Sequence, residues 1–129
     1  MGNVTYTAGI LVSEAMALMG ESAKFRNEYM EFAVSVANNL AADCFAVNNA
    51  VRQSKGKERL SEAPVLYGEG DAIPYEYETL KNIMVYGMAF WLLYQDGELT
   101  RASAQHDIYE ENKARHMLAG YDGIGNIVG

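Results

Sequence analysis

The sequence predicts an all-α protein with a four-helix core, a long irregular loop between the second and third helices, and an extended C-terminal tail. Two observations support the helices. Residues 79–95 form an apolar run without a charged residue between Ile83 and Tyr94, and apolar residues recur every three or four positions from Phe25 to Val51. The apolar run is typical of a helix that is covered on nearly all sides, and it is too short to span a membrane, which takes about 20 residues. The recurring spacing from Phe25 to Val51 is that of one helix face.

Composition indicates one domain with a substantial core, because half of the 129 residues are hydrophobic. We expect a single helical domain over residues 1–120 and a flexible docking tail over residues 121–129. The net charge of −7 argues against unspecific binding of nucleic-acid phosphates, which needs a basic face. Cys44 is the only cysteine, which excludes an intramolecular disulfide, and its place on the apolar stripe indicates packing. The N-terminus shows no secretory signal, so we expect a cytosolic origin.

The first two helices are predicted from apolar spacing and from residues that cap helices. We expect the first over residues 8–19, capped by Thr5 or Thr7 and stopped by Gly20. The second is predicted as one long helix over residues 22–51. Its apolar stripe consists of Phe25, Tyr29, Phe32, Val36, Leu40, Cys44, Val47 and Val51.

The apolar run is predicted to be the central helix, entered after Pro74 and ended by Asp96-Gly97. Gly87 lies in its middle, where glycine costs about 1 kcal/mol relative to alanine. We interpret this glycine as a place where another backbone packs closely. Because the whole run is expected to be buried, Trp91→Ala is expected to cost about 3–5 kcal/mol of stability.

The fourth helix is predicted over residues 98–118, with a thin apolar pattern and a stop at Gly120. The tail that follows is rich in glycine, so we expect that it does not hold a helix by itself. Such an apolar, flexible end is either disordered or reserved for docking to another chain. The docking interpretation assigns partner binding to Tyr121, Ile124, Ile127 and Val128.

A cluster of basic residues, Arg52, Lys55, Lys57 and Arg59, follows the second helix in this acidic chain. One interpretation is a solvated helix end, where cations interact favourably with the helix dipole. The other is contact with an acidic partner or with the acidic surface of a neighbouring copy.

Residues 61–77 hold both prolines of the chain and are predicted to form an irregular loop. A short edge strand at residues 64–67 remains open. Irregular connections of this length are uncommon inside compact domains and are often functional. The loop's apolar residues need a surface to lie on, which we expect to be an adjacent subunit. These candidate partner-binding residues are Val65, Leu66, Tyr67 and Ile73.

The sequence carries little that indicates catalysis. Glu28, Glu31 and Asp43 are similar to the acidic residues that hold magnesium in helical nucleotide pyrophosphohydrolases, but a second acidic pair is missing. His106 and Glu110 lie one helical turn apart, yet a divalent metal site needs three or four ligands. We therefore predict no catalytic residue, no metal site and no cofactor.

The order of these features resembles the head–tail adaptor (connector) proteins of tailed bacteriophages. The resemblance covers most of the chain and is weakest over residues 36–58 and in the tail. It rests on a pattern of helices and a Val-Tyr-Gly-x-Ala block. The matching residues are Met19-Gly20-Glu21, Leu60-Ser61, Asp71-Ala72-Ile73-Pro74, Leu80, Val85-Tyr86-Gly87-Met88-Ala89, Leu92-Leu93, Gln95-Asp96-Gly97-Glu98, Arg101 and Tyr109-Glu110-Glu111.

The resemblance implies a small helical virion protein without enzymatic activity, twelve copies of which form a ring beneath the portal. Its partners would be the portal protein, a tail or stopper protein and its own copies. DNA would pass through the channel without specific binding, and no membrane would be involved. The protein would be made in the host cytoplasm and end in the neck of the virion. The alternatives are a small helical nucleotide pyrophosphohydrolase and a tail-completion or stopper protein, a class that tends to be rich in β-structure.

Overall fold

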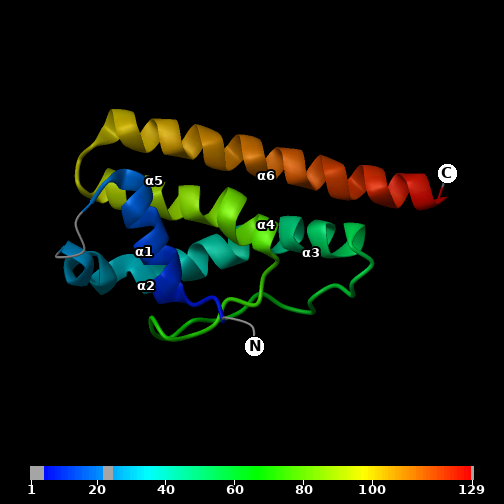
Figure 1. Cartoon of the computed structure of the whole chain (residues 1–129), viewed down its shortest axis with the longest axis horizontal. Coiled ribbons are helices and arrows are strands. Elements are labelled where there is room, and N and C mark those ends of the chain that lie inside the picture. Colours follow the sequence, from blue (N-terminus) through cyan, green and yellow to red (C-terminus); the bar gives the residue numbers. More distant parts are fainter. Residues whose placement is uncertain (1–4, 22–24, 129) are drawn as a thin grey trace.

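The computed structural model describes residues 5–21 and 25–128, with side chains described as far as residue 119. Every regular element in these ranges is helical, so the predicted all-α class is confirmed. The elements are α1 (Ala8–Met19), α2 (Arg26–Asp43), α3 (Phe45–Ser54), α4 (Tyr77–Thr79), the π-helical turn η2 (Leu80–Met84), α5 (Val85–Gln95) and α6 (Leu99–Val128). Figure 1 shows α6 along one edge of the molecule, beside α5 and α3, with α1 crossing the front. No helix among the described residues is long and apolar enough to cross a membrane.

α1 begins and ends where the sequence predicts, with Thr7 as its cap and Gly20 as its stop. The Thr7 hydroxyl accepts a hydrogen bond from the Ile10 amide at 3.2 Å, which satisfies one of the free N–H groups of the first turn. Gly20 ends the helix in the left-handed region at φ 75°, where a side chain would be strained.

The long second helix is divided in two, so its predicted extent over residues 22–51 was wrong. α2 begins at Arg26 and α3 ends at Ser54. Cys44 separates them, although hydrogen bonding continues there: its amide bonds the Leu40 carbonyl at 2.8 Å, and its carbonyl accepts the Asn48 amide at 2.9 Å. The predicted stripe nevertheless faces inward over most of its length. Its buried members are Tyr29, Val36, Leu40, Cys44, Val47 and Val51.

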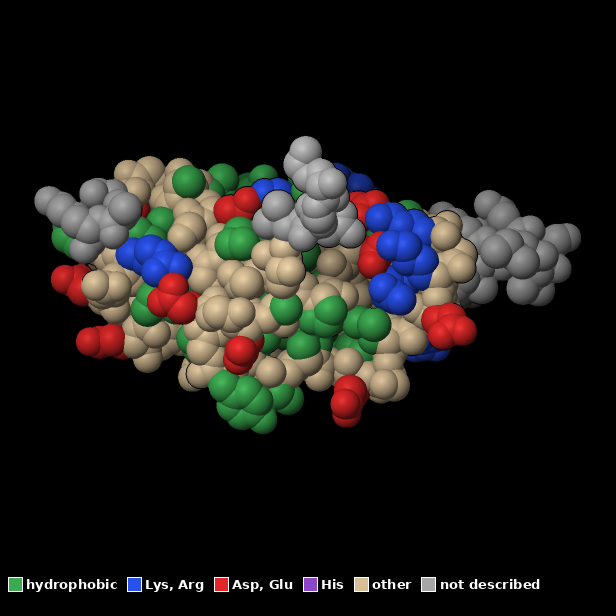
Figure 2. Space-filling model, turned by 60° about the horizontal axis from the view of Figure 1, so that its bottom comes forward, with side chains coloured by type: hydrophobic (Ala, Val, Ile, Leu, Met, Phe, Trp, Pro, Cys, Tyr) green, Lys and Arg blue, Asp and Glu red, His purple; other side chains and the backbone are tan. Residues whose placement is uncertain are grey.

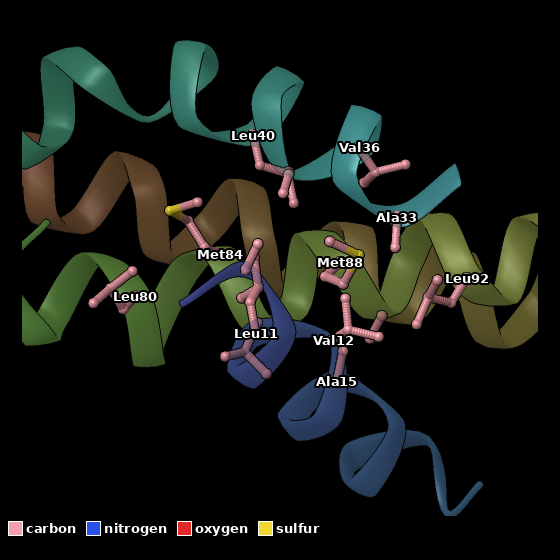
Figure 3. Close-up of a cluster of buried hydrophobic side chains, with 14 of the residues drawn as sticks. Leu11, Val12, Ala15, Ala33, Val36, Leu40, Leu80, Met84, Met88 and Leu92 are labelled. Carbon is pink, nitrogen blue, oxygen red and sulfur yellow. The ribbon is translucent and has the colours of Figure 1, made fainter. Parts of the chain in front are cut away.

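The central helix is built from α4, η2 and α5, which follow one another without interruption. Within η2 the Val85 amide reaches back five residues to the Leu80 carbonyl, the bond of a π-helical turn. Leu80, Met84, Met88 and Leu92 are spaced four residues apart and are all buried. Figure 3 shows this row facing Leu11, Val12 and Ala15 of α1 and Ala33, Val36 and Leu40 of α2.

One face of the central helix is open to solvent, so the expectation that it is covered on nearly all sides was wrong. Trp91 is 39 % exposed and Tyr94 is 54 % exposed, because the packed neighbours of α5 are α1, α2 and α6, and these leave one side free. Truncating Trp91 therefore removes less buried surface than expected. We lower the expected cost of Trp91→Ala to about 2–3 kcal/mol.

Gly87 marks a close approach, as predicted, but the neighbours are side chains rather than a backbone. A Cβ at this position would lie 2.6 Å from Leu40 Cδ2 and 2.8 Å from Tyr109 Cε2. Both distances are shorter than van der Waals contact. Gly87 therefore lets α2 and α6 approach α5 at the same point.

α6 continues to Val128, so the predicted end at residue 118 and the extended tail were both wrong for the backbone. Glycine in a helix costs about 1 kcal/mol relative to alanine but does not remove a hydrogen bond, so Gly120 does not stop the helix. α6 packs on α3, α5 and η2. Its last turns run past the end of α3 in Figure 1.

Residues 55–76 connect α3 to α4 without a strand, so the short strand at residues 64–67 was not found. The only sheet-like pairing in the described part of the chain is an isolated antiparallel bridge between Thr7 and Ala72. This irregular loop follows the edge of the molecule opposite α6 in Figure 1.

Candidate partner-binding site

The loop over residues 55–76 is held to the body at its second half by the start of α1. The Ile73 amide bonds the Tyr6 carbonyl at 2.8 Å, and the Ala8 amide bonds the Asp71 carbonyl at 3.0 Å. The Gly9 amide bonds the Glu69 carbonyl at 2.8 Å. The bonds of Ala8 and Gly9 use free N–H groups of the first turn of α1, so the loop satisfies donors that a helix end leaves without partners.

Three asparagines of α2 and α3 hold the loop backbone at other points. The Asn38 side chain bonds both the amide and the carbonyl of Leu66, each at 2.7 Å. Asn49 does the same for Leu60, at 2.7 Å to the amide and 3.2 Å to the carbonyl. The side-chain oxygen of Asn48 accepts a hydrogen bond from the Glu76 amide at 2.7 Å. Sequence analysis missed these contacts, because asparagine in a helix is not by itself a signal for loop anchoring.

The four predicted loop residues divide into two pairs. Leu66 and Ile73 are 3 % and 2 % exposed, so the expectation that they lie on an adjacent subunit is corrected: both pack into the core of their own chain. Val65 and Tyr67 are 65 % and 87 % exposed. Leu66 is held inward by its packing and by its bonds to Asn38, whereas the side chains on either side of it face solvent.

The predicted tail residues Tyr121, Ile124, Ile127 and Val128 lie on the last turns of α6, and their side chains fall outside the described residues. The described turn before them is apolar and open: Met117 is 40 % and Leu118 is 64 % exposed. The structure therefore places the predicted tail on a helical arm, and partner binding by these four residues stays a prediction.

Most of the basic cluster is used within the chain. Arg52, Lys55 and Lys57 approach the Glu76 carboxylate at 3.1, 3.3 and 2.7 Å, and Lys55 also bonds Glu78 at 2.7 Å. Among the described residues Arg59 forms no ion pair. Figure 2 shows Lys and Arg side chains gathered near one end of the molecule with acidic side chains beside them. The cluster joins the end of α3 to the start of α4 by ion pairs within the chain. Neither the solvated helix end nor the contact with an acidic partner predicted these pairs.

The environment of Glu76 favours its charged form. Its side chain is 8 % exposed, and burial alone would raise the pKa of this carboxyl. Hydrogen bonds from Lys57 and Lys55 outweigh that effect and hold the pKa of Glu76 below its usual value. The ionised carboxylate is therefore a structural part of the junction.

A second cluster lies where α6 meets the junction of α2 and α3. The Asp43 carboxylate accepts hydrogen bonds from the Tyr109 hydroxyl and, at 2.6 Å, from the Lys113 ammonium. Burial would raise the pKa of Asp43, but these two donors outweigh it and lower it. Burial also raises the pKa of the neighbouring Cys44 thiol to about 12, so the thiol is protonated and serves as packing, as predicted.

A recess of about 230 Å³ opens beside this cluster between α2, α5 and α6. Its lining combines aromatic rings with polar groups: Asn39, Leu40, Asp43, Gly87, Phe90, Trp91, His106, Tyr109 and Glu110. The Phe90 and His106 ring centroids lie 4.7 Å apart, and His106 Nε2 lies 3.7 Å from Glu110 Oε1. The recess was missed because the exposure of Trp91 was not predicted.

The acidic residues considered for catalysis are not gathered. In the described part of the chain no group of three His, Cys, Asp or Glu side chains is placed to hold a metal ion. Glu28 and Glu31 lie exposed on α2, whereas Asp43 is engaged by Tyr109 and Lys113. The one-turn spacing of His106 and Glu110 brings Nε2 to 3.7 Å from Oε1, and no third metal ligand joins them among the described residues.

Comparisons with known protein families, with curated proteins and with solved structures find no match to this chain.

Proposed function

We propose that this chain is a head–tail adaptor subunit of a tailed bacteriophage, a structural protein without enzymatic activity. In this proposal, copies form a ring, with twelve as the expected number, that joins the portal to a tail or stopper protein. The ring continues the DNA channel in the neck of the virion. Its body is a four-helix core, in which α2 with α3 and α4 with η2 and α5 each act as one rod.

The observation that carries the proposal is the arm formed by the last turns of α6. The helix runs past the end of α3 (Figure 1), so its final turns lie beyond the elements that support its first part. Met117 and Leu118 are exposed where this arm begins, and the apolar residues Tyr121, Ile124, Ile127 and Val128 follow in the sequence. In this proposal these residues form one apolar surface with Met117 and Leu118, of the kind that marks interaction sites, and the arm docks into the portal.

The loop supplies the second contact that a ring subunit needs. Val65 and Tyr67 are the loop's most exposed apolar residues, and hydrogen bonds hold the backbone between them. A contact that is rigid before binding loses less conformational entropy on association. In the ring this segment reaches the adjacent copy.

The charge of the chain agrees with a channel that DNA passes without stopping. The net charge is −7, and three of the four residues in the basic cluster are paired with Glu76 or Glu78. A surface without unpaired basic clusters offers little attraction to phosphates.

The test of this proposal is deletion of residues 121–129. The described contacts of α6 with the body lie before this segment, so we expect an unchanged melting temperature and an unchanged mean residue ellipticity in the far ultraviolet, since only the helical signal of the deleted residues is lost. Binding to the cognate portal ring, measured by co-sedimentation and electron microscopy, should be lost.

A matched control replaces Tyr77, an exposed tyrosine on α4, with alanine and should leave portal binding intact. Undiminished binding after the deletion would show that the arm is not the portal contact. A full-length chain that stays monomeric and never binds portal would overturn the adaptor assignment as a whole.

A further inference from the structure

We propose that Tyr67 of one copy inserts into the recess between α2, α5 and α6 of the next copy, so that a fixed loop residue meets an aromatic recess. The inference rests on the proposed ring and specifies the contact between its subunits. The contact requires three things. Tyr67 must project from the surface of its own chain, the recess must match a tyrosine in size and chemistry, and the two must lie where neighbouring copies in a ring can bring them together.

Tyr67 is displayed by a rigid support rather than by a free loop. Its own amide and that of Gly68 both bond one carboxylate oxygen of Asp71, at 2.6 and 3.1 Å. The residue before it, Leu66, is buried and bonded twice to Asn38. The backbone is thus held on both sides of a side chain that is 87 % exposed, and a backbone arranged before binding lowers the entropic cost of docking.

The recess has room for one aromatic side chain. Its volume of about 230 Å³ is below the roughly 300–1,000 Å³ of pockets that enclose small-molecule ligands. Phe90, Trp91 and His106 border it, and their rings offer the offset and edge-on contacts that aromatic pairs prefer. Trp91 is 39 % exposed at this site, so it retains apolar surface for an incoming ring to cover.

The polar groups of the recess fit a neutral donor better than a cation. Asp43 is already bonded by Lys113 at 2.6 Å. Glu110 lies 3.4 Å from the same ammonium and 3.7 Å from His106. Because both carboxylates have cationic neighbours, an additional lysine or arginine would meet Lys113. A phenol hydroxyl adds no charge and donates to a carboxylate that retains free acceptor positions.

The placement of the two features suits a ring. The loop runs along the edge of the molecule opposite α6 (Figure 1), whereas α6 contributes one wall of the recess. Figure 2 brings the loop edge forward and shows hydrophobic side chains projecting there. A projection at one edge of the molecule and a recess bordered by the helix at the other edge can repeat head to tail from one copy to the next. Such contacts close into rings when the rotation allows.

A segment of the portal or of a tail protein is the competing occupant of the recess. We favour a second copy of this chain over such a segment, because the chain itself carries an exposed tyrosine, Tyr67, whose backbone is held in place. It also provides both the ring and the hydroxyl that the lining accommodates.

The chain carries its own reporter, because Trp91 is its only tryptophan and lines the recess. As wild-type protein is concentrated, we expect its emission to shift to the blue in step with the mass measured by light scattering. Tyr67→Ala should raise the concentration at the midpoint of this shift by about tenfold or more, the size of an interface hot spot. Tyr77→Ala, the matched exposed tyrosine, should leave the midpoint unchanged.

Disulfide trapping tests the pairing directly, with and without the cognate portal ring to promote assembly. Chains with Tyr67→Cys are mixed with chains carrying Trp91→Cys, or Glu110→Cys as a second position on the recess. Native Cys44 is fully buried and serves as background. We expect cross-linked dimers of the mixed pair only, since disulfides require Cα atoms within about 7 Å. Tyr77→Cys chains mixed with the same partners should give none.

The outcomes separate this inference from the adaptor assignment. Oligomers that form without a blue shift, or cross-links between two Tyr67→Cys chains, would overturn the recess contact. So would mixed cross-links no stronger than the Tyr77→Cys background, and in each case portal binding by the arm would stand. A chain that neither associates nor binds portal would overturn both.

Discussion

The loop over residues 55–76 and the final turns of α6 were both expected to need another chain for support, yet the structure treats them differently. The loop lies against its own body through Asn38, Asn48 and Asn49, and it buries Leu66 and Ile73. The arm of α6 extends past α3 and is supported by its own helical hydrogen bonds. A segment without regular structure is thus fixed in place by the body, whereas the regular helix continues past the end of α3.

This difference shows that regularity and support are separate properties. Side chain to backbone hydrogen bonds replace a sheet or a helix in the loop, and they satisfy the polar groups that burial would otherwise leave unpaired. The exposed residues Val65 and Tyr67 therefore belong to a rigid surface. Met117 and Leu118 lie on the regular helix that leads into the arm, and both are exposed.

The largest expected effect is loss of the loop's anchor. Leu66→Ala should lower the free energy of unfolding by about 2–5 kcal/mol, because it empties a fully packed position. The matched control is Val65→Ala, one residue away and 65 % exposed, which should change stability by less than about 0.5 kcal/mol. Urea unfolding measures both. Equal losses of unfolding free energy in the two variants would mean that Leu66 is no more buried than Val65 and does not anchor the loop.

An intermediate effect is expected from acid at the junction of the loop with α4. The folded pKa of Glu76 is depressed, so its contribution to stability is complete above the usual glutamate pKa of about 4.3. That contribution disappears as the pH falls through the lower folded pKa. Glu76→Gln should be less stable than wild type at neutral pH, and the gap should narrow below that value.

Thermal melts over a pH series measure this gap. Glu62→Gln is the control, since Glu62 is exposed on the same loop and forms no ion pair within the described residues. A gap between Glu76→Gln and wild type that stays constant through the acid range would show that the carboxylate charge does not hold the junction.

The smallest effect on stability is expected at the arm. Leu118→Ser changes a side chain that is 64 % exposed, so unfolding should shift by less than about 0.5 kcal/mol. If the arm docks to the portal, the same substitution should weaken portal binding measurably. A large loss of stability would reveal support for the arm from its own chain, and the contrast with the loop would disappear.

Sequence alone determined the helices that depend on local chemistry. α1 is set by Thr7 and Gly20, the inward stripe from Tyr29 to Val51 by its spacing, and the need for glycine at residue 87 by its place in an apolar run. Caps and periodicity are properties of neighbouring residues, so they can be read before the chain is folded.

Only the tertiary structure decided which apolar residues are covered. Trp91 was expected in the core and is partly exposed, while Leu66 and Ile73 were expected outside and are buried. The same holds for the basic cluster, which meets Glu76 from a distant part of the sequence. Burial and charge pairing depend on contacts between segments far apart along the chain, and neither apolar spacing nor charge content specifies which segments meet.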